Sequence, residues 1–411
     1  MVPGGEEAAA VLRLSSILRM VPAFAAVMIL AGVVFTASCG NGLYPEVTSS
    51  RTPTATPTQA AGGAFLYVTN YADGTISEFS RNLTTGALTL IGTVSAGSKN
   101  GPKGIAIDPS NRYLYATNFK DGTVLEFNIN GTTGALTAIG AGSVSDGANS
   151  GPEQIAISPS GNFLWVTDFK ASTITIWTIT SGALGSKATF SGAGMVGPFG
   201  LAINSAGTIL FMSDYAQGVI YALSVNTSTG ALTNSTGSPV LSEGTFGGTP
   251  GLPVLSPNGA NMVVGDESSV DLSLFQINST TPYLQYLTSA AAADPQPFGA
   301  SWASVASNTI VVTANQSLSS PTNGSVSSFI LSGTALLSSN NVLGINEPTE
   351  LAVDPQNVYA YTADQGDGTV AQYQFNAVCG GTTQTICYVK DFADEKPANP
   401  SSGPFGIALT H

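Results

Sequence analysis

A few charged residues have types and spacing suited to binding and hydrolysing a small anion. Lys99 and Lys103 flank a Gly-Pro pair, and Glu153 follows a second Gly-Pro pair fifty positions after Lys103. Lys120 and Lys170 close the segments NFK and DFK, which are also fifty positions apart. Ammonium groups gathered in a chain of net charge −13 would focus an anion, and a carboxylate beside them, Glu153, is the candidate general base. The alternative is that these lysines are solvated loop residues, which is their usual role.

A second candidate position is the residue that follows a recurrent proline. It carries different side chains along the chain, namely Lys103, Glu153, Phe199, Phe298, Thr349 and Phe405. Because a repeat does not dictate residues that vary between its copies, this position favours ligand binding. The three phenylalanines predict an apolar floor under the charged groups. The alternative is packing around a central axis, since aromatic side chains mostly serve packing.

A third set is a recurrent Asn or Asp. Its members are Asn70, Asn118, Asp168, Asp214, Asp266, Asn315 and Asp364. Side-chain oxygens of this kind ligate Ca²⁺, and the consecutive aspartates Asp168, Asp214 and Asp266 are the metal candidates. We favour turn capping instead, because Asn and Asp commonly bond to nearby backbone. The single histidine, His411, and the absence of a CxxC pair argue against zinc. We therefore predict no metal and no cofactor.

All of these positions belong to a repeat. The motif LYVTN at 66–70 recurs in seven copies whose closing Asn or Asp residues are spaced by 48, 50, 46, 52, 49 and 49 positions. A second motif, GPKGIAI at 101–107, recurs before most copies and appears last as GPFGIAL at 403–409. Alternation of apolar and polar residues, as in DGTVLEF at 121–127, predicts half-buried strands. A period near fifty is typical of four-stranded propeller blades.

The predicted fold is all-β, a single seven-bladed β-propeller over residues 64–411. The strands along each unit are A (GIAI-like), B (LYVT-like), C and D. The chain begins on strand B and ends on a lone strand A, so residues 403–410 should complete the blade that starts at residue 64. Such closure removes free sheet edges. The B–C and D–A loops then share one face around the channel mouth, where the candidate residues fall.

The motifs resemble the YVTN-type β-propeller repeat of the seven-bladed lactonase-like family, which includes bacterial 6-phosphogluconolactonase and fungal muconate cycloisomerase. The resemblance implies, for the enzymes, a His-Pro-Arg-type start to strand A and a glutamate after the LYVxN asparagine. Here the first place reads Gly-Pro-Lys, Gly-Pro-Glu or Gly-Pro-Phe, and only Glu267 matches the second. We favour a binding or scaffold propeller that holds a small molecule or protein at its mouth. A lactonase-like hydrolase acting on a small acidic lactone is the alternative.

The N-terminus is typical of an exported protein. Arg13 and Arg19 precede an uncharged run over 21–37, and residues 1–38 are predicted to be a signal peptide. The sequence TASC at 36–39 resembles a lipobox, which predicts lipidation at Cys39. Residues 39–63, rich in Thr, Pro and Ala, are predicted to be a disordered tether. We expect an extracytoplasmic monomer held on a bacterial membrane through Cys39 alone.

Charge and cysteine content add two further predictions. Residues 1–38 carry two basic and two acidic side chains, so the mature part also has a net charge of −13. Such a chain repels nucleic acid. Cys379 and Cys387 flank the predicted hairpin between strands C and D of the last blade, where two cysteines can come close enough to bond. We predict a disulfide there, in keeping with an oxidising compartment.

Overall fold

The computed structural model describes residues 63–97, 101–192, 194–242, 248–292, 296–317, 324–379, 381–393 and 403–411, which form strands and turns without a helix. The predicted signal peptide, Cys39, the tether up to residue 62 and Lys99 lie outside these residues. Within the described ranges there is therefore no apolar helix of a length that would span a membrane.

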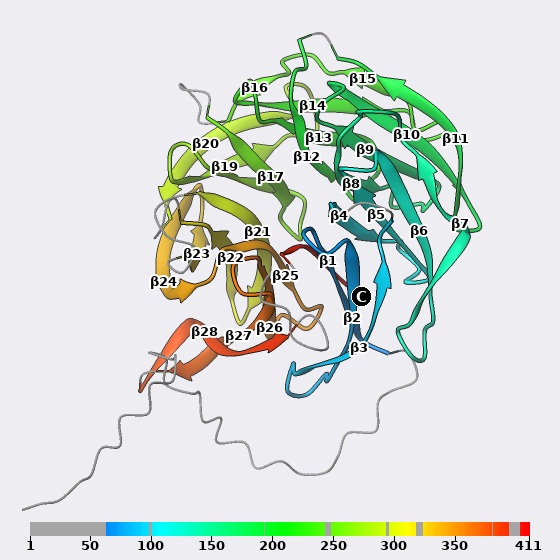
Figure 1. Ribbon diagram of the computed structural model, residues 1–411. Coiled ribbons are helices and arrows are strands. Elements are labelled where there is room, and N and C mark those ends of the chain that lie inside the picture. Colours follow the sequence, from blue (N-terminus) through cyan, green and yellow to red (C-terminus); the bar gives the residue numbers. More distant parts are fainter. Residues whose placement is uncertain are drawn as a thin grey trace, which may run out of the picture. The chain divides into compact units, whose positions relative to one another are not determined.

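The described residues form seven antiparallel sheets, arranged as blades around a central axis (Figure 1). From blade 1 to blade 7 the inner strands are β29 (Pro404–Leu409), β4 (Pro102–Ile107), β8 (Pro152–Ile157), β12 (Pro198–Ile203), β17 (Pro250–Leu255), β21 (Pro297–Val305) and β25 (Pro348–Val353). The second strands are β1 (Phe65–Asn70), β5 (Tyr113–Asn118), β9 (Phe163–Asp168), β13 (Ile209–Asp214), β18 (Asn261–Asp266), β22 (Asn308–Asn315) and β26 (Tyr359–Asp364).

The third strands are β2 (Thr75–Arg81), β6 (Thr123–Ile129), β10 (Thr173–Thr180), β14 (Val219–Val225), β19 (Asp271–Ile277), β23 (Gly324–Ser332) and β27 (Thr369–Cys379). The outer strands are β3 (Leu88–Ser95), β7 (Leu136–Ser145), β11 (Ala183–Phe190), β15 (Leu232–Asn234), β16 (Val240–Leu241), β20 (Leu284–Ala291), β24 (Ala335–Ile345) and β28 (Thr382–Ala393). The seven-bladed, four-stranded architecture predicted from the repeat is confirmed.

The ring closes through the C-terminal strand, as predicted. β29 pairs antiparallel with β1, with Leu66 opposite Leu409 and Val68 opposite Ile407. Beyond the ladder, the Thr410 N–H donates to the Phe65 carbonyl at 3.0 Å. Blade 1 therefore combines both ends of the described chain, and β1 has a partner strand on each side.

The LYVTN motif joins neighbouring blades. In blade 1 the Tyr67 hydroxyl donates to the carbonyl of Gly134 in the next blade at 2.7 Å, and Thr69 Oγ1 donates to the Lys103 carbonyl at 2.6 Å. The final Asn70 instead donates through Nδ2 to Thr75 and Ser77 of its own blade. The aromatic bond to a turn glycine recurs at three other positions, namely Tyr115, Trp165 and Tyr361. In these four units the motif therefore connects one blade to the next.

Blade 4 departs from the predicted single outer strand. Two short strands, β15 and β16, both pair with β14. The residues between them include Pro239, which has no N–H to donate to the ladder. The proline therefore interrupts the outer edge of this blade.

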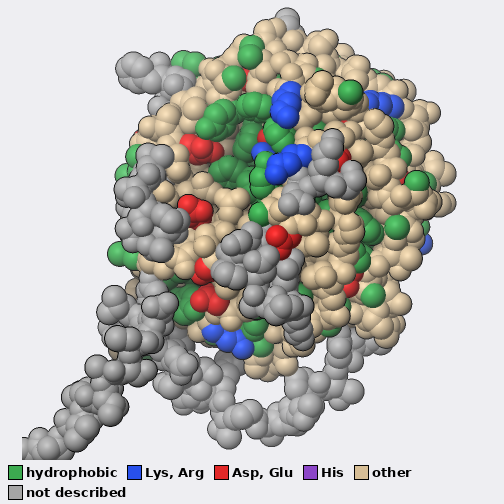
Figure 2. All heavy atoms as spheres, in the orientation of Figure 1, with side chains coloured by type: hydrophobic (Ala, Val, Ile, Leu, Met, Phe, Trp, Pro, Cys, Tyr) green, Lys and Arg blue, Asp and Glu red, His purple; other side chains and the backbone are tan. Residues whose placement is uncertain are grey.

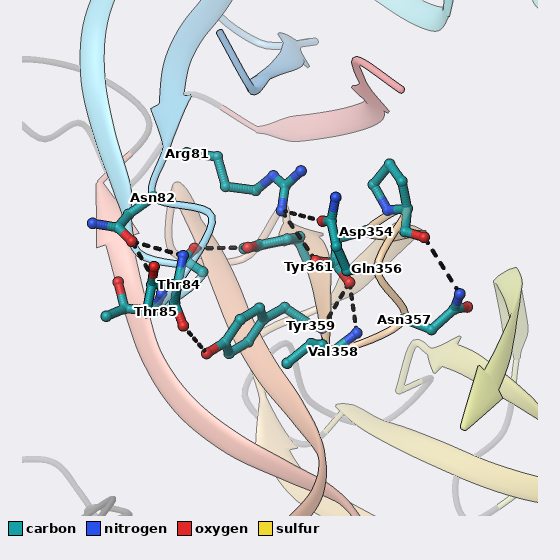
Figure 3. Close-up of polar contacts among 12 residues, drawn as sticks. Arg81, Asn82, Thr84, Thr85, Asp354, Gln356, Asn357, Val358, Tyr359 and Tyr361 are labelled. Carbon is teal, nitrogen blue, oxygen red and sulfur yellow. Dashed lines mark hydrogen bonds and ion pairs between the residues drawn. The ribbon is translucent and has the colours of Figure 1, made fainter. Parts of the chain in front are cut away.

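The contact between blades 7 and 1 contains a buried ion pair (Figure 3). Arg81 Nη1, at the end of β2, lies 3.0 Å from Asp354 Oδ2 and 3.3 Å from Gln356 Oε1. The side chains of Arg81 and Asp354 are each only 1% exposed. The equivalent ends of β6 and β19 carry Ile129 and Ile277. Arg81 therefore stands at a strand position that is apolar in blades 2 and 5.

Candidate active site

Seven residues form a ring around the channel mouth, which we call the rim ring. Each directly follows a second strand, and its N–H donates to the residue before the proline of its own inner strand, as Phe119 does to the Gly101 carbonyl at 2.9 Å. The members are Tyr71, Phe119, Phe169, Tyr215, Glu267, Gln316 and Gln365. Their common hydrogen bond places them at equivalent positions in the seven blades. All seven share one position in the repeat, but only Glu267 was a candidate from the sequence.

The second residue of each inner strand lies deeper. Phe199, Phe298 and Phe405 come from blades 4, 6 and 1, which are not neighbours, yet their rings meet edge to face with centroids 5.7 and 5.4 Å apart. Contact between such distant blades places the three rings over the axis, and each is nearly buried. The three rings therefore pack against one another around the axis, below the rim ring, and we call them the floor. Figure 2 shows a hollow lined with hydrophobic side chains near the centre of this face.

A hydrogen bond crosses the channel next to this floor. Gln154 Nε2 of blade 3 donates to Glu350 Oε1 of blade 7, and the Ile407 N–H donates to Glu350 Oε2 at 3.2 Å. Burial raises the pKa of Glu350 to about 7, while these two hydrogen bonds lower it. The bond from Gln154 to Glu350 therefore ties opposite blades together beside the floor.

Lys103 and Glu153 form an ion pair between blades 2 and 3. Lys103 Nζ lies 2.7 and 2.8 Å from the two carboxylate oxygens of Glu153. The same ammonium lies 4.3 Å from the ring centroid of Phe119, 5.3 Å from that of Phe405 and 5.6 Å from that of Tyr71. Burial raises the pKa of Glu153, and the Lys103 charge opposes this shift. Both carboxylate oxygens of Glu153 are thus engaged by a cation.

Two exposed lysines extend this arrangement. Lys120 Nζ lies 4.6 Å from the ring centroid of Tyr71, and Lys170 Nζ lies 4.2 Å from that of Phe119. The order along the mouth is therefore Lys120, Tyr71, Lys103, Phe119, Lys170, in which cations and rings alternate. We call these five residues the cationic sector. The structure brings together the predicted lysines that it describes, and Figure 2 shows basic side chains at one side of the hollow.

Glu267 lies in the rim ring of blade 5, at the glutamate position that the family resemblance implies. Its Oε2 accepts a hydrogen bond from the Tyr215 hydroxyl at 3.1 Å. Its Oε1 is buried and has no hydrogen-bond partner among the residues that the structure describes. Burial raises the pKa of Glu267 to about 7, the Tyr215 bond lowers it and the Asp266 charge raises it. An ionisable group with this pKa near neutral pH is suited to proton transfer.

The recurrent aspartates support turns and loops. Asp168 accepts hydrogen bonds from Thr173 and Thr175, at 2.9 and 2.6 Å, in the adjacent strand. Asp214 accepts from two backbone N–H groups in the loop before β12, at 2.8 and 3.0 Å. Asp266 accepts from the Thr249 N–H at 3.0 Å. Over the described ranges, no three His, Cys, Asp or Glu side chains are grouped to hold a metal ion.

Two other features lie away from the mouth. Cys379 and Cys387 join β27 to β28, with Sγ atoms 2.11 Å apart and Cα atoms 6.1 Å apart, as the hairpin spacing predicted. Arg112 lines a cavity of about 340 Å³ that is formed by the A–B turns and a C–D hairpin of blades 2 and 3. The strand directions place this cavity on the face opposite the mouth.

A closed ring of seven four-stranded blades, with polar and aromatic side chains gathered at one mouth, defines a seven-bladed β-propeller. The family described as Lactonase, 7-bladed beta-propeller, matches residues 43–149 and 139–246. The chain therefore belongs to the seven-bladed lactonase-like β-propellers. No curated protein matches its sequence.

Solved structures share this fold at low identity. A provisionally assigned 6-phosphogluconolactonase from Bacteroides fragilis is 15% identical with a TM-score of 0.71, covering 87% of this chain and 100% of that one. A second protein with this provisional assignment, from Bacteroides uniformis, is 16% identical with a TM-score of 0.69, covering 85% of this chain and 100% of that one. The periplasmic gluconolactonase of Pseudomonas aeruginosa is 15% identical with a TM-score of 0.64, covering 85% and 99%. These likenesses establish the fold.

Proposed function

We propose that this protein is a lactonase-like hydrolase that opens a small acidic lactone at its channel mouth. The observation that carries the proposal is Glu267, a mouth carboxyl with a pKa of about 7 and an unpaired buried oxygen among the described residues. An unpaired buried acceptor costs free energy that a bound hydroxyl group or water can recover. The cationic sector belongs to blades 1 to 3 and Glu267 to blade 5. One end of the mouth therefore suits an acid group, and another suits the reacting carbonyl.

The chemistry needs one base and one water molecule. Ionised Glu267 takes a proton from water as the water oxygen forms a bond to the lactone carbonyl carbon. The ring C–O bond then breaks, and the leaving alkoxide takes up a proton, which yields a hydroxy acid. Glu153 is a weaker base for this step because both of its oxygens already bind Lys103. We therefore propose Glu267, and not the sequence candidate Glu153, as the base.

Replacing this base should lower the rate and leave the fold intact. With 5-carboxyphthalide and 6-phosphogluconolactone as probes, Glu267→Gln should reduce kcat/KM for the hydrolysed lactone by about 10²–10⁴-fold. The wild-type rate should rise with pH and level off above about pH 7, because only the ionised base accepts the proton. A pH-stat assay that follows the released acid measures both effects.

Tyr215→Phe provides the matched variant. The Tyr215 hydroxyl lowers the pKa of Glu267 by hydrogen bonding to it, so its removal should shift the acid limb of the pH profile upward. Glu267→Gln should keep or raise the wild-type free energy of unfolding near neutral pH, because the raised pKa means that the charged form of this half-buried carboxyl opposes folding. If the Glu267→Gln variant keeps the wild-type rate and pH profile, Glu267 is not the base.

The binding or scaffold function favoured by the sequence analysis is the main competitor. It predicts saturable binding of a small anion or a protein at the mouth without turnover of any lactone. The family match and the raised pKa of Glu267 favour the hydrolase. Tight binding of 5-carboxyphthalide without hydrolysis would reverse that preference.

We also propose that the propeller is exported and lipid-anchored, on the basis of the TASC motif at 36–39 and the uncharged segment before it. A lipid on Cys39 would hold the protein on an extracytoplasmic membrane surface. In a bacterial host, Cys39→Ser should move the protein from the membrane fraction to the soluble or secreted fraction. Cys387→Ser, which removes a cysteine from the propeller, is the control and should leave any folded protein in the membrane fraction. Unchanged fractionation of Cys39→Ser would reject the anchor.

A further inference from the structure

The aromatic rings of the mouth form one connected surface. Starting at Tyr71, ring contacts run through the three floor phenylalanines to Tyr215 and Phe169, with centroids 6.3, 5.4, 5.7, 5.5 and 6.4 Å apart along the series. Tyr71, Tyr215 and Phe169 belong to the rim ring and are only partly buried. These three rim residues therefore offer ring surface to a ligand, and the nearly buried floor closes the mouth beneath them.

Polar groups are unevenly distributed around the mouth. Blades 1 to 4 contribute only aromatic residues to the rim ring, whereas blades 5 to 7 contribute Glu267, Gln316 and Gln365. On the aromatic arc, Lys103 is already neutralised by Glu153. The exposed Lys120 and Lys170 remain to attract an anion.

A sugar acid would fit this surface poorly. Each of its hydroxyl groups loses water on binding and needs a hydrogen-bond partner in return. The floor consists of three phenylalanines, which offer no such partner. A flat apolar ligand instead buries its faces against rings, where stacked and edge-to-face contacts are favourable.

We propose that the mouth selects an aromatic carboxylate, with its ring on the phenylalanine floor and its carboxylate between Lys120 and Lys170. The inference rests on the proposed function for the identity of the site and adds the class of substrate, an aryl lactone bearing an acid group. The lactone carbonyl then lies toward the polar arc that contains Glu267. The names of the structural relatives refer instead to gluconolactone and its phosphate.

The test is a binding measurement that does not depend on turnover. Isothermal titration calorimetry with the Glu267→Gln variant compares 5-carboxyphthalide, cyclohexanecarboxylate and gluconate at low ionic strength. We expect 5-carboxyphthalide to bind tightest, at least about tenfold more tightly than gluconate. Cyclohexanecarboxylate should have an affinity between those two.

Two substitutions and one control locate the ligand. Phe298→Leu keeps the floor apolar. It should weaken binding of the aromatic acid by about three- to tenfold and binding of cyclohexanecarboxylate by less. The double variant Lys120→Gln, Lys170→Gln should bind all three acids more weakly, and its binding should depend less on salt concentration. Lys390→Gln should change nothing, because Lys390 packs on the ring of Phe392 in the outer strand β28, away from the mouth.

The outcomes separate this inference from the proposed function. Gluconate binding as tightly as the aromatic acid, or no binding of the aromatic acid to folded protein, overturns the substrate class, even if Glu267-dependent lactone hydrolysis is observed. Aromatic acid binding that depends on Phe298 and the lysine pair supports the substrate class, even if no lactone is hydrolysed and the hydrolase proposal fails.

Discussion

A protein that lacks residues 403–411 is expected to aggregate or to lose cooperative unfolding. This segment supplies β29, whose side chains Phe405, Ile407 and Leu409 are all buried. Burial of each such side chain contributes about 1.5–3 kcal/mol, and the lost ladder hydrogen bonds add roughly 1 kcal/mol each. Because native domains are stable by only about 5–15 kcal/mol, the sum is comparable to the whole free energy of unfolding.

The measurement is thermal unfolding followed by circular dichroism, together with size-exclusion chromatography. Removal of His411 alone is the control, since this exposed residue lies outside β29. A synthetic peptide of residues 403–411 added during refolding should restore part of the cooperative transition, because it can pair with β1. A truncated protein with the wild-type melting curve would refute the role of β29 in closing the ring.

Breaking the ion pair between Arg81 and Asp354 is expected to be the most costly single substitution. Arg81→Met leaves the Asp354 carboxylate buried without its cation, and removing one partner of a buried pair typically costs about 3–5 kcal/mol. The loss should appear as a lower denaturant midpoint in urea unfolding, with an unchanged slope. The large loss of stability is expected because both side chains are only 1% exposed, whereas an exposed pair would contribute at most about 1 kcal/mol.

The double variant distinguishes a pair effect from poor packing. Asp354→Asn added to Arg81→Met removes the uncompensated charge. The double variant should therefore lose less free energy of unfolding than the two single variants lose together. Lys390→Met, at an exposed lysine of the outer strand, is the control and should cost less than about 0.5 kcal/mol. A loss below about 1 kcal/mol for Arg81→Met would show that this interface is held by its other contacts.

The sequence by itself determined the blade count, the strand order and the closing partner of residues 403–410. These properties are recorded locally, because each unit repeats the same alternation of apolar residues and the same turn residues along the chain. The Cys379–Cys387 bridge was predictable for the same reason, since it spans a single hairpin. The rim ring is also recorded in the sequence, as one position per repeat, although of its members only Glu267 matched a family motif.

Only the tertiary structure decided which side chains from different blades meet. The hydrogen bond from Gln154 to Glu350 across the channel and the Arg81–Asp354 pair join residues 196 and 273 positions apart. Their contacts depend on the curvature of the ring and on the width of the channel, which no period in the sequence records. The raised pKa that makes Glu267 the candidate base arises mainly from burial. Burial of one carboxyl depends on how whole blades pack together, so a repeat motif can mark its position but cannot set its pKa.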